Sequence, residues 1–196
     1  MNIAVRQYLP TDFESAVVVL GDAFVTDPLH VAAFGSQRLD QNRLFFRIGL
    51  EHLFTSHAYV ALAGDELQGY VHFARSPACL PPPEQVEAAT ATILQPLDDA
   101  APRILEWLST WCRHDPDKLH AHLGPIGVSP KAQGLGVGTA LMKSYLDHLD
   151  AEGIAGYLET TSEKNVSFYK RFGFEVLQKE DLLGTPNWYM WRSKPT

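Results

Sequence analysis

The chain has 196 residues, of which 45% are hydrophobic and 20% are charged, and its formal net charge is -7. These values are ordinary for a globular fold, and the length predicts a single domain over residues 1–196. The acidic balance and the lack of a Lys/Arg-rich run argue against nucleic acid as a partner. Cys79 and Cys112, the two cysteines, are too few for a disulfide framework or a cysteine-based zinc site.

The beginning of the chain shows no basic segment followed by an apolar stretch, and the run AVVVL at 16–20 is too short to span a membrane. We therefore expect a cytoplasmic protein with reduced cysteines and no membrane partner. The sequence leaves a homodimer open.

Hydrophobic periodicity predicts a mixture of strands and helices. Thr11 or Asp12 is suited to cap the first helix, and Gly64-Asp65 marks the turn of a hairpin. In chain order the expected elements are a strand (2–9), helices (13–24 and 41–55), a hairpin (58–76), a helix (102–113), a strand (118–128), a helix (139–151), a strand (154–161), a short helix (165–172) and a closing hairpin (174–180 with 187–193).

The segment 76–117 has an unusual composition, with three consecutive prolines at 81–83 and two tryptophans, Trp107 and Trp111. The prolines favour extended backbone, whereas the tryptophans follow a helical pattern. Two interpretations stay open: a lid that contributes to specificity, or a helical insertion packed on the core.

The stretch GPIGVSPKAQGLGVGTALM at 124–142 has the highest density of glycine and proline in the chain. Pro125 lies inside a strand-like segment, and a proline there predicts a bulge because it cannot donate to the ladder. Such a bulge leaves backbone groups free for an extended ligand that contains amides.

Gly134, Gly136 and Gly138 precede a predicted helix, and their backbone can approach a ligand closely. Loop N–H groups and a helix N-terminus together suit a pyrophosphate. The loop is not of the Walker type, since no lysine follows Gly138, and Thr139 stands where a dinucleotide fingerprint needs its third glycine. A glycine-rich turn without a ligand is the alternative.

The bulged strand, the QGLGVG loop and the following helix resemble the cofactor motif of the GNAT superfamily of acyl-CoA N-acyltransferases. A second stretch, LETTSEKNVSFYKRFGFEV at 158–176, resembles that family's Asn-x-x-x-Tyr helix followed by Gly-Phe. The resemblance implies an α/β fold with a mostly antiparallel central sheet, a bulged and splayed strand pair, and flanking helices. Segment 76–117 is longer than the family's simplest members carry.

The resemblance also implies a binding site for acetyl-CoA as co-substrate, with no metal. Pantetheine would pair with the backbone around Ile126 and Val128, in an opening between the two splayed strands, and pyrophosphate would meet the N–H groups that follow. The predicted cofactor-binding residues are Ile126, Gly127, Val128, Gln133, Gly134, Leu135, Gly136, Val137, Gly138, Thr139, Asn165 and Tyr169.

Acyl transfer to an amine benefits from a base, because an alkyl amine with a pKa near 10 is unprotonated in only about one molecule in a thousand at neutral pH. By period two, His122 lies on the strand face of Ile126 and is the first candidate. His120 and Glu159 are alternatives, as are a water relay and a purely structural His122. A metal site formed by His114, His120 and His122 is disfavoured by their spacing.

Tyr169 matches the family tyrosine that protonates the departing thiolate, with a core aromatic as the alternative. Asn165 is expected to cap its helix and to contact the cofactor. The leading hypothesis is an acetyl-CoA-dependent N-acetyltransferase that acts on a small amine by direct attack in a ternary complex. The alternatives are a protein N-terminal or lysine acetyltransferase and a non-catalytic acyl-CoA sensor.

Overall fold

The computed structural model describes residues 2–54, 56–77, 79 and 93–194. Seven strands form one sheet in the order β1-β2-β3-β4-β5-β7-β6. Every neighbouring pair in it is antiparallel except β4 and β5. The strands are β1 (Ala4–Gln7), β2 (His57–Ala63), β3 (Glu66–Arg75), β4 (His120–Val128), β5 (Ala155–Thr160), β6 (Glu175–Leu182) and β7 (Thr185–Arg192).

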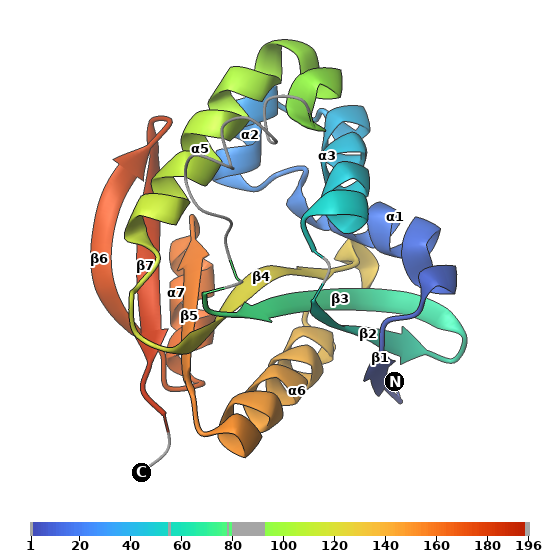
Figure 1. Ribbon diagram of the computed structural model, residues 1–196. Coiled ribbons are helices and arrows are strands. Elements are labelled where there is room, and N and C mark those ends of the chain that lie inside the picture. The colour runs from blue at the N-terminus through green and yellow to red at the C-terminus, as the bar shows by residue number, and fades with distance from the viewer. Residues whose placement is uncertain (1, 55, 78, 80–92, 195–196) are drawn as a thin grey trace.

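Helices cover both faces of the sheet (Figure 1). The α-helices are α1 (Phe13–Phe24), α2 (Pro28–Phe34), α3 (Leu39–His52), α5 (Ala101–His114), α6 (Val137–Glu152) and α7 (Glu163–Lys170). Three short 3-10 turns are η1 (Pro10–Asp12), η2 (Gln95–Ala100) and η3 (Pro130–Ala132). The predicted mixed α/β fold with a mostly antiparallel sheet is confirmed.

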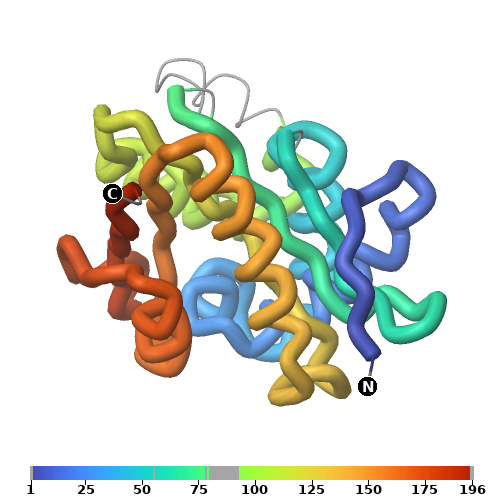
Figure 2. The backbone as a smooth tube through the Cα atoms, turned by 90° about the horizontal axis from the view of Figure 1, so that it is seen from below, coloured from blue at the N-terminus to red at the C-terminus, as the bar shows by residue number. Residues whose placement is uncertain are grey.

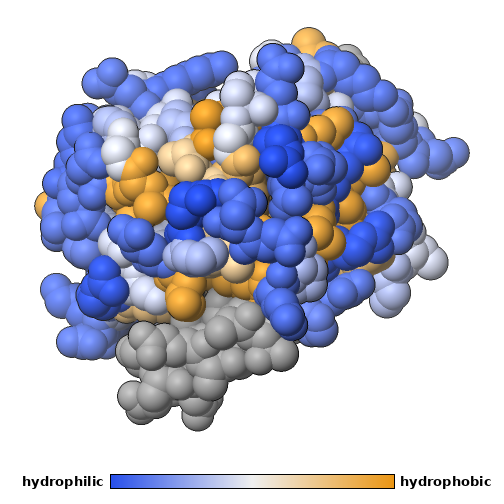
Figure 3. Space-filling model, turned by 90° about the horizontal axis from the view of Figure 1, so that it is seen from above, coloured by the Kyte–Doolittle hydropathy of each residue, from blue (hydrophilic) through white to orange (hydrophobic). Residues whose placement is uncertain are grey.

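Two apolar clusters hold the layers together. One lies between the sheet and helices α1, α2, α3 and α5, and includes Leu20, Phe46 and Trp107. The other lies between the sheet and helices α6 and α7, and includes Leu141 and Phe174. Figure 2 shows α6 crossing the middle of the sheet, with the N-terminal strand and the C-terminal hairpin at opposite sides. The outer surface on the α5 side mixes hydrophilic and hydrophobic residues (Figure 3).

The first helical layer differs from the sequence prediction in two places. Helix α2 was not predicted, although Asp27 before Pro28 is an N-terminal helix signal; the Asp27 carboxylate accepts from the backbone N–H groups of Leu29 and His30. Asp12 is the N-cap residue of α1, one of the two positions predicted, but its side chain makes no capping hydrogen bond. The Asp12 carboxylate instead binds Arg6 at 2.6 Å and accepts from the N–H of Leu9.

The predicted helix at 41–55 is α3, which begins at Leu39 and ends at His52, while residue 55 itself lies outside the described residues. Of the segment 76–117, the three prolines at 81–83 also lie outside them. Its later part forms α5, which buries Ile104 and Trp107.

Among the described residues no single helix is long and apolar enough to span a membrane. One pair of helices, Pro10–Phe24 and Pro28–Phe34, reaches the required length and composition when the two are taken together, but the pair is bent by 96°.

Candidate functional site

The parallel pairing of β4 with β5 is short. Residues 120–122 lie opposite 155–157, and no further pairing links the two strands within the described ranges. On its other side β4 continues to pair with β3 as far as Val128. The edge of β4 from Leu123 to Val128 therefore faces an opening between the strands, as the sequence predicted.

A two-against-one bulge sits where the opening begins. Ile126 lies opposite Val71 and Leu123 lies opposite Phe73, so Gly124 and Pro125 together face one residue of β3, His72. A Cβ atom on Gly124 would lie 2.7 Å from His72 Nδ1. Glycine at 124 thus gives the buried imidazole its space, and the bulge predicted from Pro125 is confirmed.

The extra residue also reverses the alternation of side chains along β4. His122 lies opposite Ala74 and Ile126 lies opposite Val71, positions that are three apart and so point to opposite faces of the sheet. Ile126 packs into the cluster under α6, whereas His122 lines a cavity on the other side. The prediction that His122 and Ile126 share a face is wrong, because period two fails across a bulge.

The glycine loop leads into α6 with exposed backbone donors. Gly136 is the N-cap residue at φ +91°, a conformation that glycine adopts without a steric penalty. The ladder of α6 begins where the N–H of Ala140 donates to the carbonyl of Gly136, so the N–H groups of Val137, Gly138 and Thr139 have no acceptor inside the helix. This end of α6 is suited to an anion.

Other predicted cofactor residues contribute differently. Val137 is 1% exposed, so only its backbone can reach a ligand, whereas the Leu135 side chain is 54% exposed. The amide of Gln133 donates to the Val128 carbonyl at 3.3 Å and joins the loop to the end of β4. Gly127 is required for packing, because a Cβ atom there would lie 2.8 Å from Leu20 Cδ2 of α1.

A cavity of about 200 Å³ lies between the sheet, α1, α2, α3 and α5, and extends to α7. One wall is aromatic, with Phe24, Phe45 and Phe46 facing Trp107 and Trp111. The opposite side carries Glu159, Asn165 and Tyr169, and residues 123–126 of β4. The cavity therefore connects the opening between β4 and β5 to an apolar chamber.

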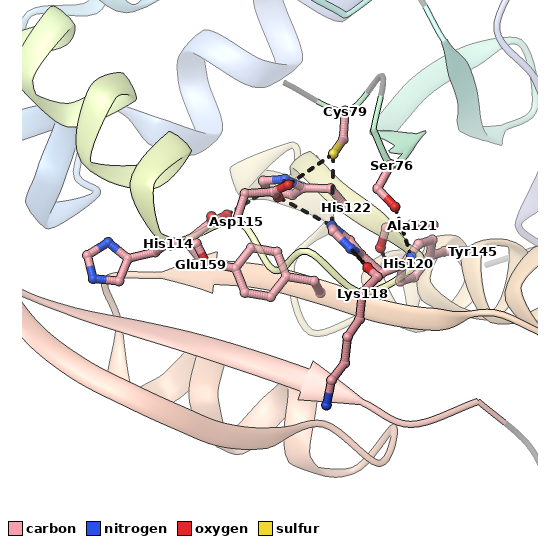
Figure 4. A network of polar contacts seen from close by, with 11 residues as sticks. Ser76, Cys79, His114, Asp115, Lys118, His120, Ala121, His122, Tyr145 and Glu159 are labelled. Atoms are coloured by element: carbon pink, nitrogen blue, oxygen red, sulfur yellow. Dashed lines mark hydrogen bonds and ion pairs between the residues drawn. The ribbon is translucent and has the colours of Figure 1, made fainter. Parts of the chain in front are cut away.

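His122 is the centre of a buried polar cluster on the floor of this cavity (Figure 4). Its Nε2 lies 2.7 Å from Glu159 Oε2, and its Nδ1 lies 3.1 Å from Asp115 Oδ1. The same Asp115 oxygen lies 3.3 Å from His120 Nε2. The Glu159 side chain is 1% exposed, and its second oxygen, Oε1, is buried with no hydrogen-bond partner in the described part of the chain.

Charge governs protonation in this cluster. Burial lowers the pKa of His122, but the charge of Glu159 and the hydrogen bond to Asp115 outweigh it and raise that pKa well above the ordinary value. For His120, burial is likewise outweighed by Asp115, which raises the pKa to about 9. Burial of Asp115 is outweighed by its two histidine partners, which hold its pKa far below the usual range. At neutral pH both imidazoles carry a positive charge.

Tyr169 and Asn165 are one turn apart on α7 and both line the cavity. Burial raises the pKa of Tyr169, and the negative charge of Asp27 raises it further, so its hydroxyl keeps its proton. The predicted capping role of Asn165 is wrong: α7 begins at Glu163 after Ser162, and the asparagine lies inside the helix with its side chain toward the cavity.

Three polar residues of the site were missed in the sequence. Asp27 lines the cavity and accepts from the Thr161 hydroxyl at 2.9 Å. Asp115 and Cys79 reach His122 and His120 from outside the motifs. For Asp27 a signal was available, because an Asp-Pro pair is typical of a helix start. For Asp115 and Cys79 there was none, because they meet the histidines from segments far apart in the sequence, and such contacts leave no local pattern.

The segment carrying α5 is a helical insertion packed on the core, one of the two interpretations that the sequence left open, while a role in specificity stays a prediction. Trp107 packs face to face on Phe45, with ring centroids 5.5 Å apart, and the Trp111 indole donates to Asn187 of β7 at 3.2 Å. The helix is thus packed on the core, and both tryptophans also line the cavity.

Comparison with known proteins decides the family. The model of the acetyltransferase (GNAT) family matches residues 26–174. The chain belongs to this family. GNAT enzymes use acetyl-CoA, and membership of the family supports an acetyl-CoA-dependent acyltransferase.

Individual GNAT relatives are similar to differing degrees. A structure described as histone acetyltransferase HPA2 and related acetyltransferase, from Corynebacterium glutamicum, has 26% identity and a TM-score of 0.72, covering 100% of this chain and 98% of that one. Arylalkylamine N-acetyltransferase 2 from Aedes aegypti has a TM-score of 0.71 at 11% identity, over 98% and 99% of the two chains, which shows the shared fold alone. Mycothiol acetyltransferase from Paenarthrobacter aurescens is 32% identical over 71 residues, which are 35% of this chain and only 22% of that relative's length.

The charges around His122 predict its protonation state, to be measured in protein from which metal ions have been removed with a chelator. Because its pKa is raised, His122 is expected to stay doubly protonated at pH 7 in nitrogen-15 NMR spectra of the imidazole. Glu159→Gln removes the neighbouring negative charge and should lower that pKa. Glu163→Gln, which changes an exposed carboxylate at the start of α7, should leave it unchanged. A His122 that titrates at the ordinary histidine value in the parent protein would contradict this account.

Proposed function

We propose that this GNAT enzyme transfers the acetyl group of acetyl-CoA to the primary amine of a small molecule, by direct attack in a ternary complex. The observation that carries the proposal is the buried and unpartnered Glu159 Oε1 at the edge of an aromatic cavity. A buried carboxylate oxygen without a donor is costly. An amine or ammonium N–H entering the cavity supplies that donor.

On the donor side, the free edge of β4 at Ile126, Gly127 and Val128 is suited to the amide groups of pantetheine. The N–H groups from Gln133 to Thr139 are suited to its pyrophosphate, because they combine a glycine loop with the start of α6. Asn165 and Tyr169 then face the region where the thioester would lie.

On the acceptor side, the cavity favours an amine with an apolar or aromatic body. Its aromatic wall suits the carbon skeleton and attracts a cation through the ring faces, while Asp27 and Glu159 supply negative charge. A volume of about 200 Å³ suits a small molecule better than a folded polypeptide chain.

The geometry favours Glu159 over His122 as the group that meets the amine. Both ring nitrogens of His122 are engaged, with Glu159 and with Asp115, and the imidazole already carries its proton at neutral pH. Glu159 Oε1 is free. We assign proton acceptance from the amine to Glu159, and assign to His122 the role of holding the carboxylate in place.

In this mechanism the amine nitrogen attacks the thioester carbonyl carbon, the C–N bond forms, and the C–S bond breaks. The surplus proton of the amine passes to Glu159, and the CoA thiolate takes a proton from the Tyr169 hydroxyl. Tyr169 then regains a proton from solvent and Glu159 releases one, so the cycle balances.

Tyr169→Phe tests the acid role, because it removes only the hydroxyl. We expect kcat to fall by about 10-fold to 10³-fold while the affinity for acetyl-CoA changes little, since the hydroxyl acts mainly in the transition state. The measurement is steady-state kinetics together with calorimetric titration of acetyl-CoA. Phe168→Leu, a change at the neighbouring aromatic ring, controls for altered packing of α7. Equal kcat in Tyr169→Phe and the parent, where chemistry limits turnover, would leave Tyr169 with a structural role.

Gly136→Asp tests the pyrophosphate loop, and Gly136→Asn is its matched control. Both side chains have the same shape and tolerate positive φ better than most residues, and the site has room, since the nearest atom to a Cβ there is 3.8 Å away. Only aspartate adds negative charge, which repels a phosphate by about 1 kcal/mol at 4 Å even in water. We expect acetyl-CoA to bind at least about fivefold more weakly to Gly136→Asp than to Gly136→Asn. Equal affinities would remove the assignment.

A free-CoA release assay tests the function itself. We expect turnover with alkyl and arylalkyl primary amines, and a loss of about 10²-fold or more in kcat/KM for Glu159→Gln. Lysine peptides and peptides with free N-termini form the second arm. Turnover with peptides alone would indicate a protein acetyltransferase, and tight acetyl-CoA binding without turnover in either arm would indicate a sensor.

A further inference from the structure

We propose that Cys79, Asp115, His120 and His122 form a binding site for a zinc ion. The four residues come from three separate places: the segment after β3, the end of α5, and β4. One ligand atom from each lies within 4.8 Å of all the others. This site lies beside the Glu159 contact of the proposed function but does not depend on it.

Four of the distances between donor atoms of these residues lie within about 0.3 Å of those expected around a tetrahedral ion. Zinc bonds of about 2.0–2.1 Å to nitrogen or oxygen and about 2.3 Å to a single sulfur place neighbouring ligand atoms about 3.3–3.6 Å apart. Here Asp115 Oδ1 lies 3.1 Å from His122 Nδ1 and 3.3 Å from His120 Nε2. Cys79 Sγ lies 3.9 Å from His120 Nε2 and 3.4 Å from Oδ2, the second oxygen of the Asp115 carboxylate.

Each histidine presents one nitrogen to the cluster and has a separate acceptor for the other. His120 Nδ1 lies 2.7 Å from the Lys118 carbonyl, and His122 Nε2 lies 2.7 Å from Glu159 Oε2. A metal-bound histidine typically donates its second N–H to a carbonyl or a carboxylate, which fixes the ring and the tautomer. Both of these acceptors are in place, which leaves His120 Nε2 and His122 Nδ1 directed at Asp115.

The metal also removes the need for two buried, doubly protonated imidazoles beside Asp115. Without it, the contacts of Asp115 with two imidazoles require both rings to carry two protons, although the His120 side chain is 0% exposed and that of His122 is 8% exposed. A zinc ion replaces one proton on each ring and the proton of the Cys79 thiol, and all three protons go to solvent. Thiolate and carboxylate then balance the charge of the ion.

The ligand types favour zinc among common cations. Mixed sulfur, nitrogen and oxygen donors suit zinc, whereas magnesium and calcium prefer oxygen alone. From the sequence we expected no metal, and a metal site formed by His114, His120 and His122 was disfavoured by their spacing. In the fold His114 lies outside the cluster (Figure 4). Its Nδ1 contacts the Thr110 carbonyl at 2.9 Å, and its Nε2 approaches Glu180. Cys79 and Asp115 complete the set instead.

The site is reachable and joins separate segments. Cys79 and His122 both line the cavity, which gives an ion a path from solvent. Bound zinc would tie the segment after β3 to the end of α5 and to β4. It would also hold His122 as a neutral imidazole that still donates its Nε2 proton to Glu159.

Cobalt(II) substitution tests the site with a readout independent of catalysis. The full chain, stripped of metal with a chelator, is titrated with Co²⁺ and followed by absorption spectroscopy. We expect the intense d–d bands of a tetrahedral ion and a thiolate-to-cobalt charge-transfer band, at one ion per chain, and displacement of the cobalt by Zn²⁺. The spectrum of an octahedral aqueous ion would overturn the proposal.

Two cysteine variants give a matched comparison. Cys79→Ser should abolish the charge-transfer band, while Cys112→Ser should keep it, because Cys112 also lines the cavity but is not part of the cluster. Circular dichroism confirms that each variant is folded. A band that survives in Cys79→Ser or disappears in a folded Cys112→Ser would place the metal elsewhere.

Zinc affinity, measured by competition with a chelating dye, tests the ligand His120 and the hydrogen-bond acceptor behind His122, Glu159. Glu159→Gln, which keeps a hydrogen-bond acceptor but removes the charge behind His122, should weaken zinc about 10-fold to 100-fold. His120→Asn removes a ligand and should weaken it further, while His114→Asn should change nothing. Equal zinc affinity in the parent and His120→Asn would overturn the site.

Discussion

The missing N–H of Pro125 is the constraint on which the rest of the site depends. A proline cannot complete a ladder, so β4 bulges at Gly124 and Pro125 opposite His72. Beyond the bulge β4 stays with β3 and separates from β5, which opens the sheet for an extended ligand. The same extra residue sends Ile126 toward α6 and leaves His122 on the side of the cavity, so one irregularity creates both the cofactor edge and the orientation of the polar cluster.

That cluster is held together by mutual compensation of buried charges. Glu159 is almost wholly buried, and removing His122 alone would leave it uncompensated, a situation that costs about 3–5 kcal/mol in other proteins. His122 in turn depends on Asp115, which also binds His120. The carboxylate that faces the cavity is thus fixed by a chain of partners, none of which needs to touch a substrate.

The sequence predicted the fold well where the signals are local. The helix at 13–24 was placed correctly, and Pro125 predicted the bulge, because both follow from a few adjacent residues. Predictions failed where a side chain's partner or orientation depends on residues outside its own local pattern. The Asp12 side chain pairs with Arg6 and makes no hydrogen bond to the start of α1, the bulge shifts the face of Ile126, and Ser162 rather than Asn165 precedes α7. Cys79 and Asp115 meet His120 only in the folded chain, so no spacing in the sequence connects them.

The proposed metal and the proposed reaction meet at one atom pair, His122 Nε2 and Glu159 Oε2. In the protonated cluster, two imidazolium rings and one Asp115 carboxylate give a net charge of one positive unit; with zinc, the ion and its two anionic ligands sum to zero. The hydrogen bond that orients Glu159 persists in both states. Loss of the neighbouring positive charge leaves the negative charge of the Glu159 carboxylate less compensated, which makes it a better partner for an ammonium group. Zinc at this cluster would therefore strengthen the attraction of Glu159 for the amine without moving the carboxylate.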